Sequence, residues 1–161
     1  MTTASLSELK KELASLSTKE LSELCLRLSK YKKENKELLS YLLFEASNEG
    51  AYILGVKEEI DTLFSEIMSG NIRNGKKILQ KALRTTKKFI KYSGQKQTEV
   101  ELLLYILKAM SDSKVRFRRY TATANLYDRT FQKLKKTLES LHPDLQFDYQ
   151  LELEKLQESD W

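Results

Sequence analysis

Apolar residues recur at helical spacing along almost the whole chain, and this periodicity is the feature that most limits the fold. The chain contains one proline, Pro143, and five glycines, which leaves little material for the turns of a many-stranded protein. No Gly/Ser-rich linker and no repeat of about 20 to 50 residues divides it. We therefore expect a single all-α domain over residues 1–161, built as a helical bundle or a short α-α superhelix of about eight helices.

Two capping boxes mark the starts of the first two helices. Ser5 precedes leucines at helical spacing and has Glu8 three residues later, and Ser17 and Glu20 repeat the arrangement. Both pairs predict short helices of about eleven residues that are joined almost without a loop.

The later helices are bounded by residues that favour helix ends. Their expected spans are 34–48, 50–70, 74–92, 98–110, 114–141 and 143–156. Asn74 is the predicted N-cap of the fifth helix, and Gly94 suits the left-handed position that closes it. Pro143 fits the first turn of the last helix.

Two of these helices have apolar patterns that predict how they pack. The sixth is apolar nearly all round and therefore belongs in the middle of a bundle. The seventh carries a heptad seam, which predicts one long helix along another, either inside the domain or across a dimer. The seam consists of Phe117, Tyr120, Ala124, Tyr127, Phe131, Leu134, Leu138 and Leu141.

Residues with catalytic or metal-binding chemistry are scarce. His142 is the only histidine, and no Glu-x-x-His, Walker or GxGxxG motif occurs, so we expect no enzymatic activity, no metal and no cofactor. Cys25 lies among leucines and is the only cysteine, which predicts a buried thiol in a reducing compartment. Because no apolar run approaches the roughly 20 residues that cross a bilayer, we expect a cytoplasmic protein that does not bind membranes.

Charge is distributed unevenly. Residues 73–98 carry nine basic residues and no acidic one, residues 114–136 carry eight basic and one acidic, and residues 137–161 carry seven acidic and one basic. The predicted basic face consists of Lys77, Lys81, Arg84, Lys88, Lys91, Arg118, Arg119, Arg129 and Lys133.

Like charges four residues apart on a helix repel one another, so this face needs a compensating anion. The acidic C-terminal segment could fold back across it, or an external partner could neutralise it. Tyr120, Tyr127 and Phe131 fall on the heptad seam and are read as core packing rather than as a platform for stacked bases. We therefore expect a non-catalytic helical interaction or scaffold module that binds an acidic protein surface or self-associates. The alternative is sequence-tolerant binding of RNA or DNA through the same helices.

Two stretches carry a resemblance to known sequences. They are LSELKKELASLSTKELSELCLRLSKYKKENKELLSYLL at 6–43 and KKFIKYSGQKQTEVELLLYILKAMSDSKVRFRRYTATANLYDRTFQKLKKTLESL at 87–141. Both resemble a family of small, uncharacterised bacterial all-helical domains. The resemblance implies a bacterial intracellular helical protein and assigns no catalytic or binding residue. The segment 49–75 matches the family least.

Overall fold

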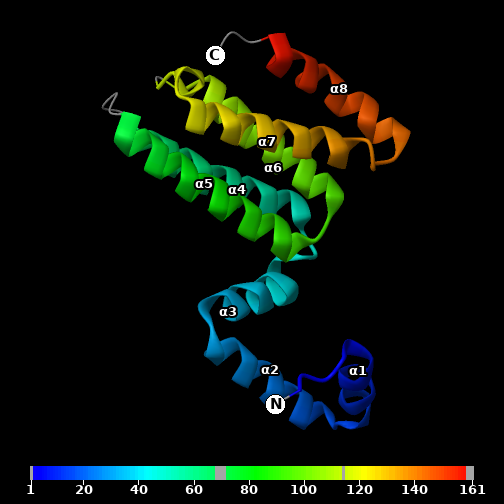
Figure 1. Ribbon diagram of the computed structural model, residues 1–161. Coiled ribbons are helices and arrows are strands. Elements are labelled where there is room, and N and C mark those ends of the chain that lie inside the picture. The colour runs from blue at the N-terminus through cyan, green and yellow to red at the C-terminus, as the bar shows by residue number, and fades with distance from the viewer. Residues whose placement is uncertain (1, 68–71, 114, 159–161) are drawn as a thin grey trace. The chain divides into compact units, whose positions relative to one another are not determined.

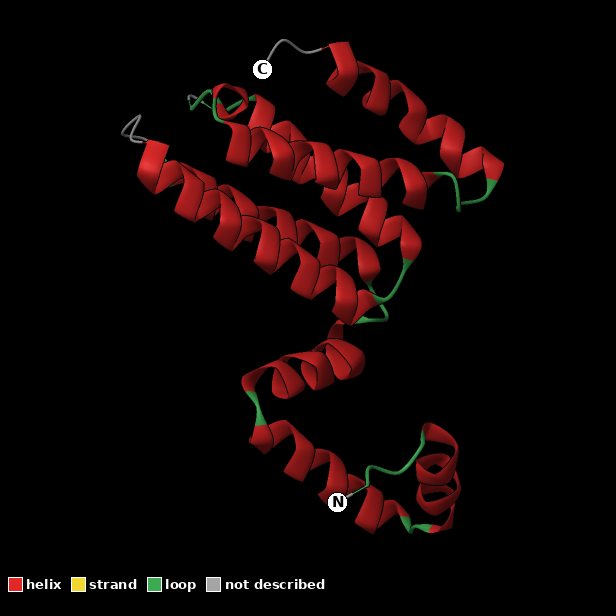
Figure 2. Cartoon of the chain, in the orientation of Figure 1, coloured by secondary structure: helices red, strands yellow, loops and turns green. Residues whose placement is uncertain are grey.

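The computed structural model describes residues 2–67, 72–113 and 115–158, and its regular structure there is entirely helical (Figures 1 and 2). Eight α-helices and no strand occur in these ranges, which confirms the predicted all-α fold. The α-helices are α1 (Leu6–Ser15), α2 (Thr18–Tyr31), α3 (Lys33–Ser40), α4 (Glu49–Ser65), α5 (Ile72–Ser93), α6 (Lys96–Ser111), α7 (Thr121–Leu138) and α8 (Pro143–Glu158). A π-helical turn, η1 (Tyr41–Glu45), follows α3, and a 3₁₀ turn, η2 (Phe117–Arg119), precedes α7.

The helices fall into two compact units, Met1–Phe44 (unit 1) and Glu45–Trp161 (unit 2). Each is described by itself below. That the two form one domain over 1–161 stays a prediction.

Unit 1 begins with the two predicted capping boxes. The Ser5 hydroxyl accepts the Glu8 N–H at 3.3 Å, and the Glu8 carboxylate accepts the Ser5 N–H at 2.7 Å. Ser17 and Glu20 make the same pair of bonds at 3.3 and 2.8 Å. The Ser5 and Ser17 hydroxyls also donate to the Glu8 and Glu20 carboxylates at 2.7 and 2.6 Å. The hydrogen bonds that the serine N–H and hydroxyl groups donate lower the pKa of both glutamates. Both predicted helix starts are confirmed.

The third helix differs from its predicted span of 34–48. It ends at Ser40 and continues as the π-helical turn, and Asn48 instead caps α4 by accepting the Ala51 N–H at 3.2 Å. Asn48 takes this role because a side-chain oxygen at an N-cap satisfies a backbone donor that the next helix leaves unpaired.

The apolar face of unit 1 is exposed. No side chain of α1, α2 or α3 is buried, and Leu6 and Leu28 are 86% and 54% exposed. Cys25 is exposed too, so the prediction of a buried thiol is wrong. The reason is geometric: three short helices enclose too little volume to cover the stripe on which Cys25 lies.

Unit 2 is organised around α6, as the sequence predicts. α4, α5, α7 and α8 all pack against it. Val100, Ile106 and Leu107 of α6 are fully buried in the core that these helices share. α6 can have neighbours on all sides because apolar residues surround its axis.

The start of α5 differs from the prediction. The helix begins at Ile72, so Asn74 is inside its first turn and is not the N-cap. Gly75 is buried there, and a Cβ on it would lie 3.5 Å from side-chain atoms of Val115 and Phe117. At the other end Gly94 has φ +67° and closes α5 as predicted. The predicted end of the preceding helix at Gly70 lies outside the described residues.

The seventh helix is shorter than its predicted span of 114–141, whose first residue, Lys114, is not among those described. α7 begins at Thr121, and the segment before it turns so that Phe117 enters the core with no exposed surface. The Thr123 hydroxyl donates to the carbonyls of Phe117 and Tyr120 and holds this turn. From Tyr127 to Leu138 the seam is confirmed, because it packs along α6 within the chain.

Candidate anion-binding surface

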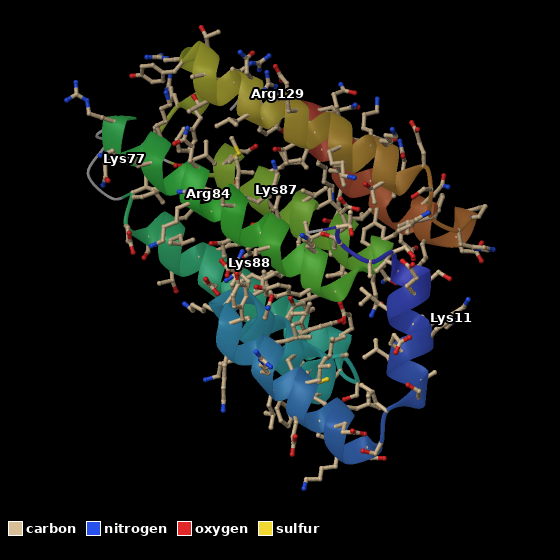
Figure 3. All side chains as sticks on the ribbon, turned by 60° about the horizontal axis from the view of Figure 1, so that its bottom comes forward. Lys11, Lys77, Arg84, Lys87, Lys88 and Arg129 are labelled. Carbon is tan, nitrogen blue, oxygen red and sulfur yellow. The ribbon has the colours of Figure 1, made fainter. Side chains whose placement is uncertain are left out.

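α5 carries the densest positive charge of unit 2 on a rigid support. Leu79 and Ala82 on its inner side are fully buried, which fixes the opposite side toward solvent. Lys77, Arg84 and Lys87 project from this outer side in Figure 3. The α5 stripe, as we call Lys77, Lys81, Arg84, Lys88 and Lys91, has four exposed members, and its fifth, Lys88, is half-buried.

Most of the predicted basic side chains are exposed. These are Lys77, Lys81, Arg84 and Lys91 on α5, Arg118 and Arg119 on η2, and Arg129 and Lys133 on α7. In Figure 3, Arg129 lies on α7, and Lys77, Arg84, Lys87 and Lys88 lie on α5.

Lys88 and Lys133 differ from the rest. Lys88 is half-buried, and its Nζ lies 4.7 Å from the Phe89 ring centroid and 5.9 Å from that of Tyr92. Lys133 is 57% exposed and its Nζ lies 3.1 Å from Oε1 of Glu99 on α6. Both ammonium groups already interact with side chains of unit 2, so they should bind an external anion more weakly than the neighbouring cations do.

The acidic C-terminal segment packs away from the α5 stripe. α8 lies against α6, and the Tyr149 hydroxyl donates to Oε1 of Glu101 at 3.0 Å and accepts from Gln97 at 3.1 Å. Leu153 and Leu156 of α8 are buried in the core. Figure 1 shows α7 between α8 and α5. The described part of the acidic segment therefore lies on α6 rather than along α5.

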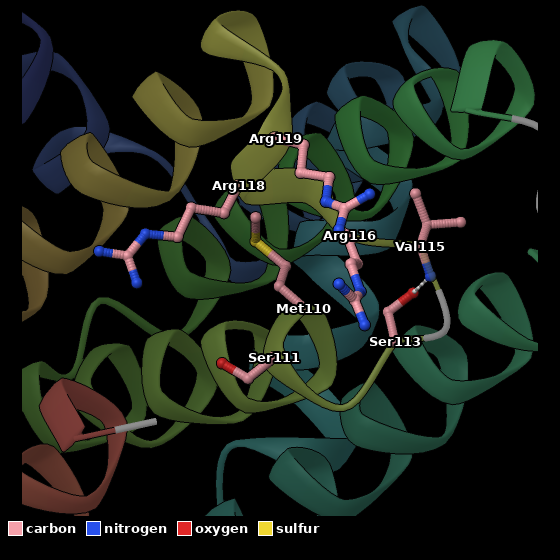
Figure 4. A pocket seen from close by; sticks show the side chains of 7 residues that line it. All are labelled: Met110, Ser111, Ser113, Val115, Arg116, Arg118 and Arg119. Carbon is pink, nitrogen blue, oxygen red and sulfur yellow. Dashed lines mark hydrogen bonds between the residues drawn. The ribbon is translucent and has the colours of Figure 1, made fainter. Parts of the chain in front are cut away.

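A cavity of about 400 Å³ opens beside η2. It is lined by Met110, Ser111, Ser113, Val115, Arg116, Arg118 and Arg119. In Figure 4, Arg116 and Arg119 extend to the same side of the turn and Arg116 ends beside Ser113, whereas Arg118 extends the other way. Because Val115 and Phe117 meet Gly75, the cavity lies at the end of unit 2 where α5 begins.

The aromatic residues of the seam divide into two groups. Tyr127 is buried and stacks on Phe131 with ring centroids 6.1 Å apart and an interplanar angle of 8°, which agrees with their prediction as core. Burial raises the pKa of Tyr127. Tyr120 is 45% exposed beside Arg119, so its prediction as core is wrong. It misses the core because the η2 turn, and not an α-helix, precedes it.

A second cavity, of about 920 Å³, lies between α4, α6 and α8. The Tyr105 hydroxyl is 2.6 Å from both carboxylate oxygens of Asp61, and Lys57 Nζ is 3.5 Å from Glu101 Oε2. Burial and the Asp61 carboxylate raise the pKa of Tyr105 to about 12, and burial raises that of Tyr149 to about 12. Both tyrosines stay protonated near neutral pH, so the carboxylates they contact are held in a network that joins the three helices.

Sequence reasoning missed Arg116 and this second cluster. Arg116 lay inside a predicted helix, and only the turn at Phe117 brings it to the cavity. The members of the second cluster come from three helices, so no local spacing identifies them. Within the described ranges, no group of three or more His, Cys, Asp or Glu residues could hold a metal ion. No described helix has the length and apolar character needed to cross a membrane.

Comparison with known proteins finds no matching family model, no similar curated protein and no matching solved structure. The resemblance to uncharacterised bacterial domains and the cytoplasmic location stay predictions.

Proposed function

We propose that this protein is a non-catalytic helical module that binds nucleic acid, without base-sequence preference, through the basic surface of unit 2. The observation that carries the proposal is the α5 stripe. Residues 73–98 contain nine cations and no carboxylate, and Lys77, Lys81, Arg84 and Lys91 are exposed on one rigid helix. Such a surface attracts a phosphate backbone by releasing its condensed counterions.

The chemistry of the stripe favours nucleic acid over an acidic protein. Protein interfaces depend on apolar and aromatic anchors at their centre, surrounded by polar residues. The apolar residues of α5 face the core of unit 2, among them Ile78, Leu79 and Leu83. Tyr120 supplies an exposed ring beside Arg119, and an unpaired base can stack on such a ring.

The length of the stripe sets the expected salt dependence. From Lys77 to Lys91 it extends about 21 Å at ~1.5 Å per residue. At ~3.4 Å per phosphate along one strand, this length matches about six phosphates. The four exposed cations of the stripe can neutralise about four of these phosphates, which would lower the affinity roughly a hundredfold between about 50 and 200 mM salt.

Fluorescence anisotropy with mixed-sequence RNA and DNA oligonucleotides tests the proposal. The triple variant Lys81→Gln, Arg84→Gln and Lys91→Gln should weaken binding and lower the salt slope by about 2.7. A matched control removes three exposed charges from unit 1, through Lys10→Gln, Lys11→Gln and Lys19→Gln, and should leave the slope nearly unchanged. Absence of binding at about 50 mM salt, or equal loss in both variants, would refute the proposal.

The exposed leucines of unit 1 favour a second function, self-association. Leu6, Leu9, Leu13 and Leu16 follow a 3-4-3 spacing, which suits packing against the helix of a second copy. Leu9 and Leu13 are 45% and 39% exposed. Sedimentation velocity should show an oligomer that Leu9→Glu with Leu13→Glu dissociates, whereas Leu54→Glu on α4 should not. A monomeric wild-type protein at about 100 µM would contradict this second function.

A further inference from the structure

We propose that the cavity beside η2 binds a phosphomonoester group, either the phosphate of a mononucleotide or the terminal phosphate of a nucleic-acid strand. The inference rests on the proposed function, because it assigns a particular phosphate to one end of the basic surface. Two observations carry it: the cavity itself, and the placement of Arg116 and Arg119 on the same side of η2 (Figure 4).

The turn that presents these arginines is anchored on its inner side. Phe117 lies between Arg116 and Arg118 in sequence and has no exposed surface. Its carbonyl accepts the Thr123 hydroxyl, and the Phe117 N–H donates to the Val115 carbonyl at 2.8 Å. The Ser113 hydroxyl accepts the Val115 N–H at 3.2 Å (Figure 4). A backbone fixed in this way lowers the entropy cost of arranging the side chains around an anion.

The lining residues match the chemistry of a phosphate. Among the seven residues that line the cavity, three are arginines and none carries a carboxylate. A guanidinium group offers planar, paired N–H donors that fit two phosphate oxygens at once. The hydroxyl of Ser113 retains its own proton for donation while it accepts from Val115.

Charge distinguishes a phosphomonoester from the diesters of a backbone. A diester carries one negative charge, whereas a monoester carries nearly two at pH 7 because its second pKa is about 6. The guanidinium groups of Arg116 and Arg119 lie on the same side of η2 and repel one another, and a dianion neutralises both. A volume of about 400 Å³ is at the lower end of the ~300–1,000 Å³ typical of small-ligand pockets, which admits a mononucleotide.

Calorimetry tests the cavity with small molecules. The wild-type protein should bind AMP and should not bind adenosine, and inorganic phosphate should compete with AMP. Arg116→Gln and Arg119→Gln should each weaken AMP binding by about tenfold or more, since each removes a charge-assisted contact. Arg27→Gln, which removes an exposed arginine from α2, should leave AMP binding unchanged. Equal binding of AMP and adenosine, or equal loss in all three variants, would overturn the inference.

A second experiment tests whether the cavity binds the terminal phosphate of a nucleic-acid strand. Otherwise identical oligonucleotides with a 5′-phosphate, a 3′-phosphate or only hydroxyl ends should differ in affinity, and Arg116→Gln with Arg119→Gln should abolish the difference. If all three oligonucleotides bind equally and AMP does not bind, the cavity inference fails while the proposed function stands. If AMP binds with the expected variant pattern and no oligonucleotide binds, the inference stands and the proposed function fails.

Discussion

Replacing Lys81 and Lys87 by glutamine should stabilise this protein while weakening its binding to nucleic acid. Both side chains are exposed on α5. Lys81 is four residues from Lys77 and three from Arg84. Lys87 is likewise four residues from Lys91 and three from Arg84. On a helix, residues three and four apart are neighbours, so the double variant removes four repulsive pairs.

The expected gain follows from these pairs. At ~0.2–0.5 kcal/mol each, four repulsions amount to about 0.8–2 kcal/mol at low salt. Glutamine and lysine have similar helix propensities, so the backbone contributes little to the difference. Lys57→Gln is the matched control with the opposite sign. Its Nζ lies 3.5 Å from Oε2 of Glu101, and loss of this pair should cost up to about 1 kcal/mol.

Urea denaturation followed by circular dichroism measures both variants. The gain of the double variant should be largest at about 10 mM salt, where charges interact over about 30 Å, and should shrink strongly near 1 M, where they interact over about 3 Å. A double variant that is no more stable than wild type at low salt would refute the reasoning. So would a gain that does not change with salt, because it would have another cause than charge repulsion.

Two further perturbations test the packing around the sites. Phe117→Ala should lower the free energy of unfolding by about 3–5 kcal/mol, because it empties a fully buried position. Phe147→Ala, at a side chain that is 75% exposed, should change it by no more than about 0.5 kcal/mol. Equal effects of the two substitutions in urea denaturation would contradict the assigned core. The raised pKa of Tyr105, about 12, favours its protonated form in the folded state, so stability should fall as pH rises from about 10 toward 12. Absorbance titration near 295 nm should show the late ionisation of Tyr105 and Tyr149 in wild type, and only that of Tyr149 in Tyr105→Phe. If every tyrosine ionises near its ordinary pKa of about 10, the hydrogen bond to Asp61 is absent.

Features that depend on neighbouring residues were predictable from the sequence. The Ser5 and Ser17 capping boxes and the Gly94 helix end involve groups within a few positions of one another. The central place of α6 was also predictable, because a helix that is apolar all round needs partners on every side.

Features that depend on which surface is covered were not predictable. Cys25 lies on an apolar stripe that the sequence assigns to a core, yet nothing in unit 1 covers it. Phe117 and Tyr120 continue the heptad spacing of α7, but burial of Phe117 outweighs helix continuation and turns the chain at η2. The same heptad spacing fits a continuous helix from residue 114 and a turn before α7. Only the packing of Phe117 against Gly75 and α6 distinguishes these two alternatives.

The sequence by itself determined the helical class, most helix ends and the charge of each segment, because these depend on residue type and on contacts a few positions apart. The tertiary structure decided where that charge lies. It packs the acidic α8 against α6, where Leu153 and Leu156 gain burial, and leaves Lys77, Lys81, Arg84 and Lys91 of α5 exposed. It also turns Arg116 and Arg119 to one side of η2 at the start of α5, since Phe117 can be buried only if the backbone bends there.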